Sequence, residues 1–203
     1  MRLTSILVAS ATVALTGCPD IENPGDGDNV EEVITTVKLS FAPEGGGTPL
    51  VFSNADPEND GSRVIDPIAL DLGTNYALTV QFLNELEDPA EDITVEVKDE
   101  GVEHQIFIYG SGVQSPATAT DDGHLIDVAY ADTDDNDLPV GLENTVDAVT
   151  AGTGELKLML RHLPPESDTV VKVEGLAADF ANDGSAGIPG DVDVDVTFPI
   201  TVE

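Results

Sequence analysis

Apolar side chains recur at every second position through much of this 203-residue chain, and this spacing constrains the fold more than any other feature. Near the C-terminus, aspartate, threonine and proline alternate with six apolar residues: Val192, Val194, Val196, Phe198, Ile200 and Val202. Because successive side chains of a β-strand point to opposite faces, this pattern predicts a strand with one buried and one solvated face. The same alternation predicts strands within residues 33–41, 76–82, 93–97, 106–108, 126–130, 156–160 and 171–173.

Turns rich in Gly, Asp and Pro separate these segments, for example at residues 45–47, 122–123 and 164–165. Many short alternating strands joined by such turns are typical of a β-sandwich, and alternation with one polar face favours antiparallel sheets. No stretch shows a helical stripe; residues 83–93 come nearest, and a proline interrupts them. We therefore predict an all-β fold, a single antiparallel Ig-like β-sandwich, over residues 30–203.

The N-terminal region has the parts of a secretory signal. Leu15-Thr16-Gly17-Cys18 resembles the bacterial lipobox, and Arg2 with a short uncharged apolar stretch precedes it. That stretch is shorter than the roughly 20 apolar residues that a membrane-spanning helix needs. We predict a cleaved lipoprotein signal peptide at residues 1–17, acylation of Cys18 as the anchor to a lipid bilayer, and an acidic flexible tether at residues 18–29.

The charge of the chain excludes several partners. It has 40 Asp and Glu residues against 7 Lys and Arg, which gives a net charge of −33. Nucleic acid is excluded because binding a phosphate backbone needs basic patches, and electrostatic attraction to anionic lipid is excluded for the same reason. Such a surface repels itself unless salt screens it, so the composition indicates saline surroundings. Since Cys18 is the only cysteine, no intramolecular disulfide is expected.

Six segments of the sequence carry a resemblance to a known family. They follow one another in the same order as in that family and span nearly all of the predicted mature chain, at residues 31–37, 83–97, 103–112, 134–145, 151–164 and 193–202. Together they resemble a family of uncharacterised lipoproteins from marine Gram-negative bacteria. The resemblance implies an envelope or surface lipoprotein and brings no established activity. Members often carry the name "type 1 periplasmic binding fold superfamily protein". That fold needs two lobes of repeated βαβ units, and because this chain is too short and lacks the helices, we expect a different fold.

One loop has the spacing of a metal site. Four oxygen-bearing side chains match positions 1, 3, 5 and 12 of a Ca²⁺-binding loop: Asp132, Asp134, Asn136 and Glu143. Asp137 stands where such a loop has Gly, and the flanking segments are predicted strands rather than the helices of an EF-hand. We predict these four residues as a candidate Ca²⁺ site, with a solvated acidic hairpin loop as the alternative.

The three histidines give a weaker metal signal. His104, His124 and His162 lie on or beside different predicted strands, with no short metal-binding spacing. A zinc or copper site would need all three to converge; otherwise they are polar-face residues.

No catalytic motif is present. The sequence has no Gly-x-Ser-x-Gly elbow and no phosphate-binding loop, and it has no free thiol once Cys18 is acylated. We therefore predict a non-enzymatic interaction or structural protein, anchored in the cell envelope at the outer membrane and facing periplasm or exterior, with Ca²⁺ as a candidate stabilising ion. The alternative is a lipoprotein that captures a glycan, peptide or small ligand for an outer-membrane transporter. An exposed cluster of Tyr76, Tyr109 and Tyr130 would favour that alternative.

Overall fold

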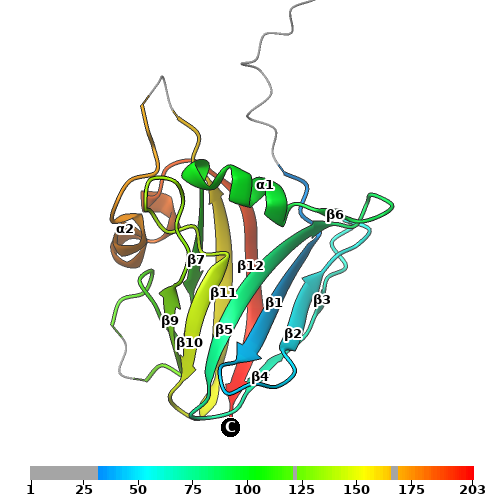
Figure 1. Ribbon diagram of the computed structural model, residues 1–203, viewed down its shortest axis with the longest axis vertical. Coiled ribbons are helices and arrows are strands. Elements are labelled where there is room, and N and C mark those ends of the chain that lie inside the picture. Colours follow the sequence, from blue (N-terminus) through cyan, green and yellow to red (C-terminus); the bar gives the residue numbers. More distant parts are fainter. Residues whose placement is uncertain (1–31, 121–122, 166–168) are drawn as a thin grey trace, which may run out of the picture. The chain divides into compact units, whose positions relative to one another are not determined.

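The described part of the chain forms two β-sheets with helices α1 and α2 at their periphery (Figure 1). This computed structural model describes residues 32–120, 123–165 and 169–203. The predicted signal peptide, Cys18 and the predicted tether lie outside these residues. Strands make up 44% of the described residues and helices 12%, so the prediction of a mostly β fold is confirmed.

The larger sheet has the strand order β3-β2-β1-β5-β10-β9-β8, and the short β6 pairs with β5. Its strands are β1 (Thr36–Pro43), β2 (Leu50–Ala55), β3 (Val64–Ile65), β5 (Asn75–Asn84), β6 (Glu91–Asp92), β8 (Val113–Gln114), β9 (Ile126–Tyr130) and β10 (Glu143–Ala148). At its centre β1 and β5 pair antiparallel over the whole length of β1. Val37, Leu39 and Phe41 are buried, as the period-two pattern predicts.

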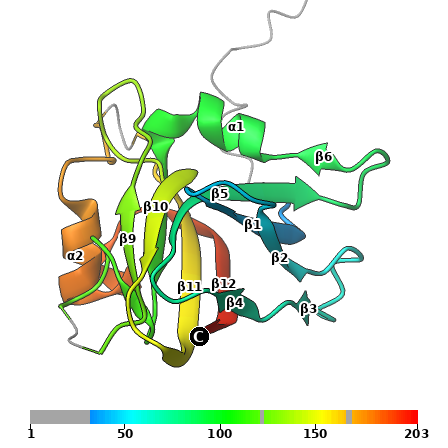
Figure 2. The same cartoon turned by 60° about the horizontal axis from the view of Figure 1, so that its bottom comes forward.

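The smaller sheet has the strand order β4-β12-β11-β7. Its strands are β4 (Ile68–Leu70), β7 (His104–Tyr109), β11 (Gly152–His162) and β12 (Asp191–Val202). Figure 2 shows β11 and β12 next to β5 and β10 of the larger sheet, and apolar side chains from both sheets form one core. Phe41 and Leu78 contribute to that core from the larger sheet, and Leu158 and Phe198 from the smaller one.

A second apolar cluster covers the opposite face of the β7–β11 pair. It joins Phe107 and Met159 to Leu176 and Phe180 of α2 (Leu176–Asp183). The rings of Phe107 and Phe180 stack with centroids 4.8 Å apart. Strand β7 is therefore buried on both faces and not on one alone.

The predicted Ig-like antiparallel sandwich is not confirmed, because both sheets are mixed. β4 pairs parallel to β12, and β8 pairs parallel to β9. The first parallel pair arises where the chain leaves β3 of the larger sheet and joins the edge of the smaller one as β4. Period-two alternation with one polar face favours antiparallel sheets as a tendency, but it does not fix the direction of any one strand pair.

The strand predicted over residues 93–97 is wrong, because this segment forms α1 (Thr94–Asp99), followed by the 3-10 turn η1 (Gly101–Glu103). Ile93 and Val97 are buried, whereas Val95 is 59% exposed. Residues four apart lie on one side of both a strand and a helix, so the pair at 93 and 97 fits either period. α2, which ends before the 3-10 turn η2 (Ser185–Gly187), buries Leu176 and Phe180 with the same spacing.

The strand predicted at residues 171–173 is also wrong. Lys172 is 1% exposed there, while Val173 is 48% exposed, so the charged side chain is inside and the apolar one outside. A further departure lies in β12, where a register shift opposite Leu160 and Arg161 leaves Val192 39% exposed. A β-bulge of this kind turns the residues beyond it to the other face.

Gly190 lets the chain pass directly beside His162 before β12 begins. Its φ is 76°, and a Cβ atom there would lie 2.0 Å from the backbone oxygen of His162. The Gly190 carbonyl accepts a hydrogen bond from Arg161 at 2.8 Å. Only glycine fits both the backbone conformation and this close approach.

We expect Gly190→Ala to lower the melting temperature far more than Gly73→Ala. Both glycines have a φ of 76°, so both substitutions carry a backbone cost of about 1–3 kcal/mol. Of the two, only position 190 also brings the new Cβ into collision with backbone, since no atom lies within 4 Å of a Cβ at position 73. Thermal and urea unfolding of the two variants measure the difference, and equal losses would contradict the close approach.

Candidate metal centre

Two histidines face each other across the β7–β11 pair. The antiparallel register places His104, at the start of β7, opposite His162, at the end of β11. Their rings stack nearly parallel, at an angle of 6° and a centroid distance of 4.7 Å. Both residues are buried, with exposed fractions of 0% and 4%. The register of the strand pair thus brings two imidazoles together inside the protein.

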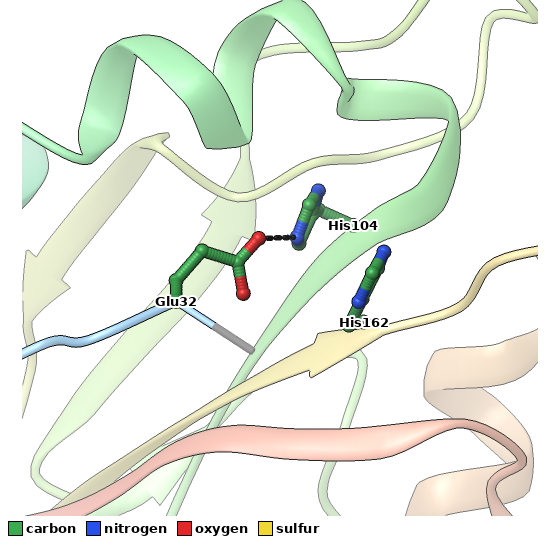
Figure 3. A group of neighbouring side chains, drawn as sticks. All are labelled: Glu32, His104 and His162. Carbon is green, nitrogen blue, oxygen red and sulfur yellow. Dashed lines mark hydrogen bonds and ion pairs between the residues drawn. The ribbon is translucent and has the colours of Figure 1, made fainter. Parts of the chain in front are cut away.

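Glu32, from the segment that precedes β1, completes the group (Figure 3). Its Oε1 lies 3.1 Å from Nε2 of His104, and its side chain is 4% exposed. One donor atom from each of Glu32, His104 and His162 lies within 4.8 Å of the others. Two imidazole nitrogens and a carboxylate form a ligand set that divalent transition metals, Zn²⁺ among them, favour in proteins.

Backbone and charge orient His104 toward Glu32. Nδ1 of His104 lies 3.1 Å from the carbonyl oxygen of Glu100, which fixes that nitrogen as the donor and leaves Nε2 facing the carboxylate. Burial disfavours the protonated ring, but the hydrogen bond and charge of Glu32 outweigh it and raise the pKa of His104 above 6.5. Burial likewise opposes the Glu32 anion, yet the contact with His104 lowers the pKa of that carboxyl below 4.5.

Two polar atoms of the group have no hydrogen-bond partner. Oε2 of Glu32 and Nε2 of His162 are buried without a hydrogen-bond partner. Glu103 is close to His162, but its Oε2 lies 3.7 Å from Nε2, beyond hydrogen-bond length. A second acidic group, Glu32 with Glu96 and Glu100, adjoins the first through their shared glutamate. Burial raises the pKa of Glu100 above 4.5.

The sequence missed this group in two respects. His124 does not join the other histidines; its Nε2 pairs with Asp127 at 2.9 Å, close to β9. The third member is Glu32, which lies 72 residues before His104 and gave no local signal. The sequence suggested a metal site only if all three histidines converged. The structure instead brings together two histidines and one glutamate.

Three of the four predicted Ca²⁺ ligands lie around a different hollow. Asp132, Asp134 and Glu143 line a pocket of about 360 Å³, and Asn136 is not part of its lining. Oxygens of the Asp132 carboxylate accept backbone N–H groups of Gly141, Leu142 and Glu143 at 2.7–3.1 Å. Those of Asp134 accept the N–H groups of Asn136 and Leu138 at 2.8 and 2.9 Å.

A lysine supplies positive charge to this loop. Nζ of Lys172 lies 2.8 Å from Oδ2 of Asp134, and the two side chains are 0% and 1% exposed. The same Nζ donates to the carbonyl oxygen of Gly101 at 2.7 Å. Burial would raise the pKa of Asp134, but the bond to Lys172 lowers it below 3.8, and burial lowers the pKa of Lys172 itself. Calcium binding at the loop stays a prediction, for which Lys172 is the competing cation.

No protein-family model, curated protein or solved structure matches this chain. The resemblance to the marine lipoproteins is therefore still a prediction. Within the described residues, no helix has the length and apolar character needed to span a membrane.

We expect Lys172→Met to lower the free energy of unfolding by about 3–5 kcal/mol, because it leaves the Asp134 carboxylate buried without its counter-charge. Urea denaturation measures the change. The matched control is Lys157→Met, whose ion pair with Glu155 at 3.6 Å is partly exposed and is worth at most about 1 kcal/mol. Equal effects of the two substitutions would contradict a buried pair.

The double variant Lys172→Met with Asp134→Leu removes both charges and should recover much of the loss.

The same samples test calcium. If the loop binds Ca²⁺, a millimolar concentration raises the melting temperature of the unmodified protein relative to chelator, and an unchanged value excludes the ion.

Proposed function

We propose that this chain is a membrane-anchored envelope lipoprotein that works without catalysis, as an interaction or structural β-domain. The observation that carries the proposal is the order of its parts. A lipobox-like Leu15-Thr16-Gly17-Cys18 and a polar segment at residues 18–29 precede a mostly β body. The resemblance to marine lipoproteins supports the same assignment.

The placement of the tyrosines favours this role over substrate capture. Tyr76 is fully buried, and its hydroxyl accepts the backbone N–H of Asp71 at 3.0 Å. The hydroxyl of Tyr130 donates to the carbonyl of Ile106 at 2.7 Å. Tyr109 packs against Phe180 of α2. Tyr76 is buried, and Tyr109 and Tyr130 are partly buried in separate places, so the three tyrosines supply no shared exposed stacking platform for a sugar or peptide.

The exposed acids fit a role in saline surroundings. Of the seven basic residues, Arg161 and Lys172 are buried and bind backbone carbonyls, so their charges do not neutralise the acidic surface. Attachment through lipid would hold such a body at a membrane that has no electrostatic attraction for it.

Cys18→Ser should move the protein from the membrane fraction to the soluble fraction in a Gram-negative host, because no acyl chain can then be attached. The released protein should unfold at the same urea concentration as the wild type. Thr16→Ala is the matched control, since it keeps a small residue before Gly17 and should stay with membranes. A Cys18→Ser protein that has lost its signal peptide and still remains with membranes would show that the anchor is not this cysteine.

The melting temperature should rise steadily as NaCl increases from about 0.1 to 1 M, because the Debye length falls from about 10 to 3 Å over that range. Potassium chloride at matched ionic strength should act equally, since screening does not depend on the identity of the cation. A flat response to both salts would exclude the halophilic interpretation.

A further inference from the structure

We propose that Glu32, His104 and His162 bind one divalent transition metal ion, with Zn²⁺ as the ion that best matches the donors. The proposal is independent of the lipoprotein assignment, because it rests on side chains within the described body. Imidazole nitrogens select Zn²⁺ and its neighbours over hard ions such as Ca²⁺, which prefer six to eight oxygens. Each donor comes from a different segment: the chain before β1, the start of β7 and the end of β11.

The donor atoms are already close, but one ring must turn, because stacked rings at an angle of 6° direct their nitrogen lone pairs in parallel. Zn²⁺ binds nitrogen and oxygen at about 2.0–2.2 Å, so ligand atoms in a tetrahedral site lie about 3.3 Å apart. The three donors already lie within 4.8 Å of one another (Figure 3). Because His104 is held by Glu100, rotation of the Glu32 side chain and a turn of the His162 ring out of the stack would bring the three donors to that separation. The fourth position is open to water or to Glu103.

An ion would satisfy the atoms that the protein alone leaves unpaired. A metal-free ion pair accounts for Nε2 of His104 and Oε1 of Glu32, which lie 3.1 Å apart. It does not account for Oε2 of Glu32 or Nε2 of His162, which are buried without a hydrogen bond. Such groups cost about 1–3 kcal/mol each when unsatisfied. One ion bound between the carboxylate and the two rings would give both of these unpaired atoms a partner.

The surroundings favour a cation and hold the ligands in place. The contact between Nδ1 of His104 and the Glu100 carbonyl is the usual outer-shell arrangement of a metal-bound histidine. Glu103 and Asp193 add negative charge around the two rings. A bound ion would join the segment before β1 of the larger sheet to β7 and β11 of the smaller one. In a predicted mature domain without a disulfide, it would act as a cross-link between the sheets.

The experiment uses the full chain in detergent, stripped with chelator and then titrated with Zn²⁺ in buffer that contains millimolar Ca²⁺ to occupy surface carboxylates. We expect one high-affinity equivalent by calorimetry and a higher melting temperature. Glu32→Gln and His162→Gln should each weaken that binding by roughly tenfold or more. His124→Gln, at the histidine outside the group, should bind like the wild type.

Absence of a saturable one-to-one phase would overturn the proposal, and so would equal affinity in Glu32→Gln, His162→Gln and wild type. If His162→Gln does not fold, Glu32→Gln and the visible spectrum of the Co²⁺-loaded wild type decide. Intense absorption of a four-coordinate Co²⁺ ion with nitrogen ligands supports the site. The weak bands of octahedral, oxygen-bound Co²⁺ exclude it.

Discussion

The antiparallel pairing of β7 with β11 is the contact on which the rest of the structure depends. One face of the pair carries Ile106 and Leu158 into the core between the sheets, and the other carries Phe107 and Met159 under α2. A slip of one residue would exchange these faces, so apolar burial on both sides fixes the register. The same register sets His104 opposite His162. The position of the two histidines at the end of this strand pair is thus a consequence of apolar packing along the strands.

Buried cations form a second constraint. Guanidinium nitrogens of Arg161 donate to the carbonyls of Gly190 and Ser185, and Lys172 donates to that of Gly101. These bonds attach the segments before β12 and α2 to the body of the fold. They also withdraw two positive charges from the surface of a chain whose net charge is −33. The two buried cations thus stabilise the interior but leave the acidic surface without their neutralising charge. Because repulsion between surface acids is screened by salt, the stability of this protein is linked to ionic strength.

The sequence predicts those strands whose burial is decided locally. In β1 and β5 every second residue enters the core, so periodicity alone identifies both strands. It fails at Ile93 and Val97, whose spacing suits a helix as well as a strand. It fails again at Lys172, because the reason for burying this residue is Asp134, a carboxylate in a distant loop. Alternation favours antiparallel sheets but does not fix the direction of a particular strand pair, and so the two parallel pairings could not be foreseen.

The candidate metal centre was within partial reach of the sequence. His104 precedes the predicted strand at residues 106–108 and His162 follows that at 156–160, and antiparallel pairing of the two strands sets such ends side by side. Which strands pair is a property of the whole fold, however, and periodicity does not supply it. Glu32 could not be found at all, since its position depends on where the chain enters β1.

The turn after α1 connects the two polar sites. Three nearby carbonyl oxygens of this turn accept hydrogen bonds from different parts of the fold. That of Glu100 binds the ring of His104, that of Gly101 binds Lys172, and that of Glu103 binds the backbone N–H of Leu163. Ile93 and Val97 hold the start of the same segment in the main core. These anchors act on one short piece of backbone, in which the carbonyl that orients His104 and the carbonyl that binds Lys172 belong to adjacent residues, Glu100 and Gly101. The acidic loop and the histidine pair, which line separate parts of the structure, therefore share one short backbone segment as a support.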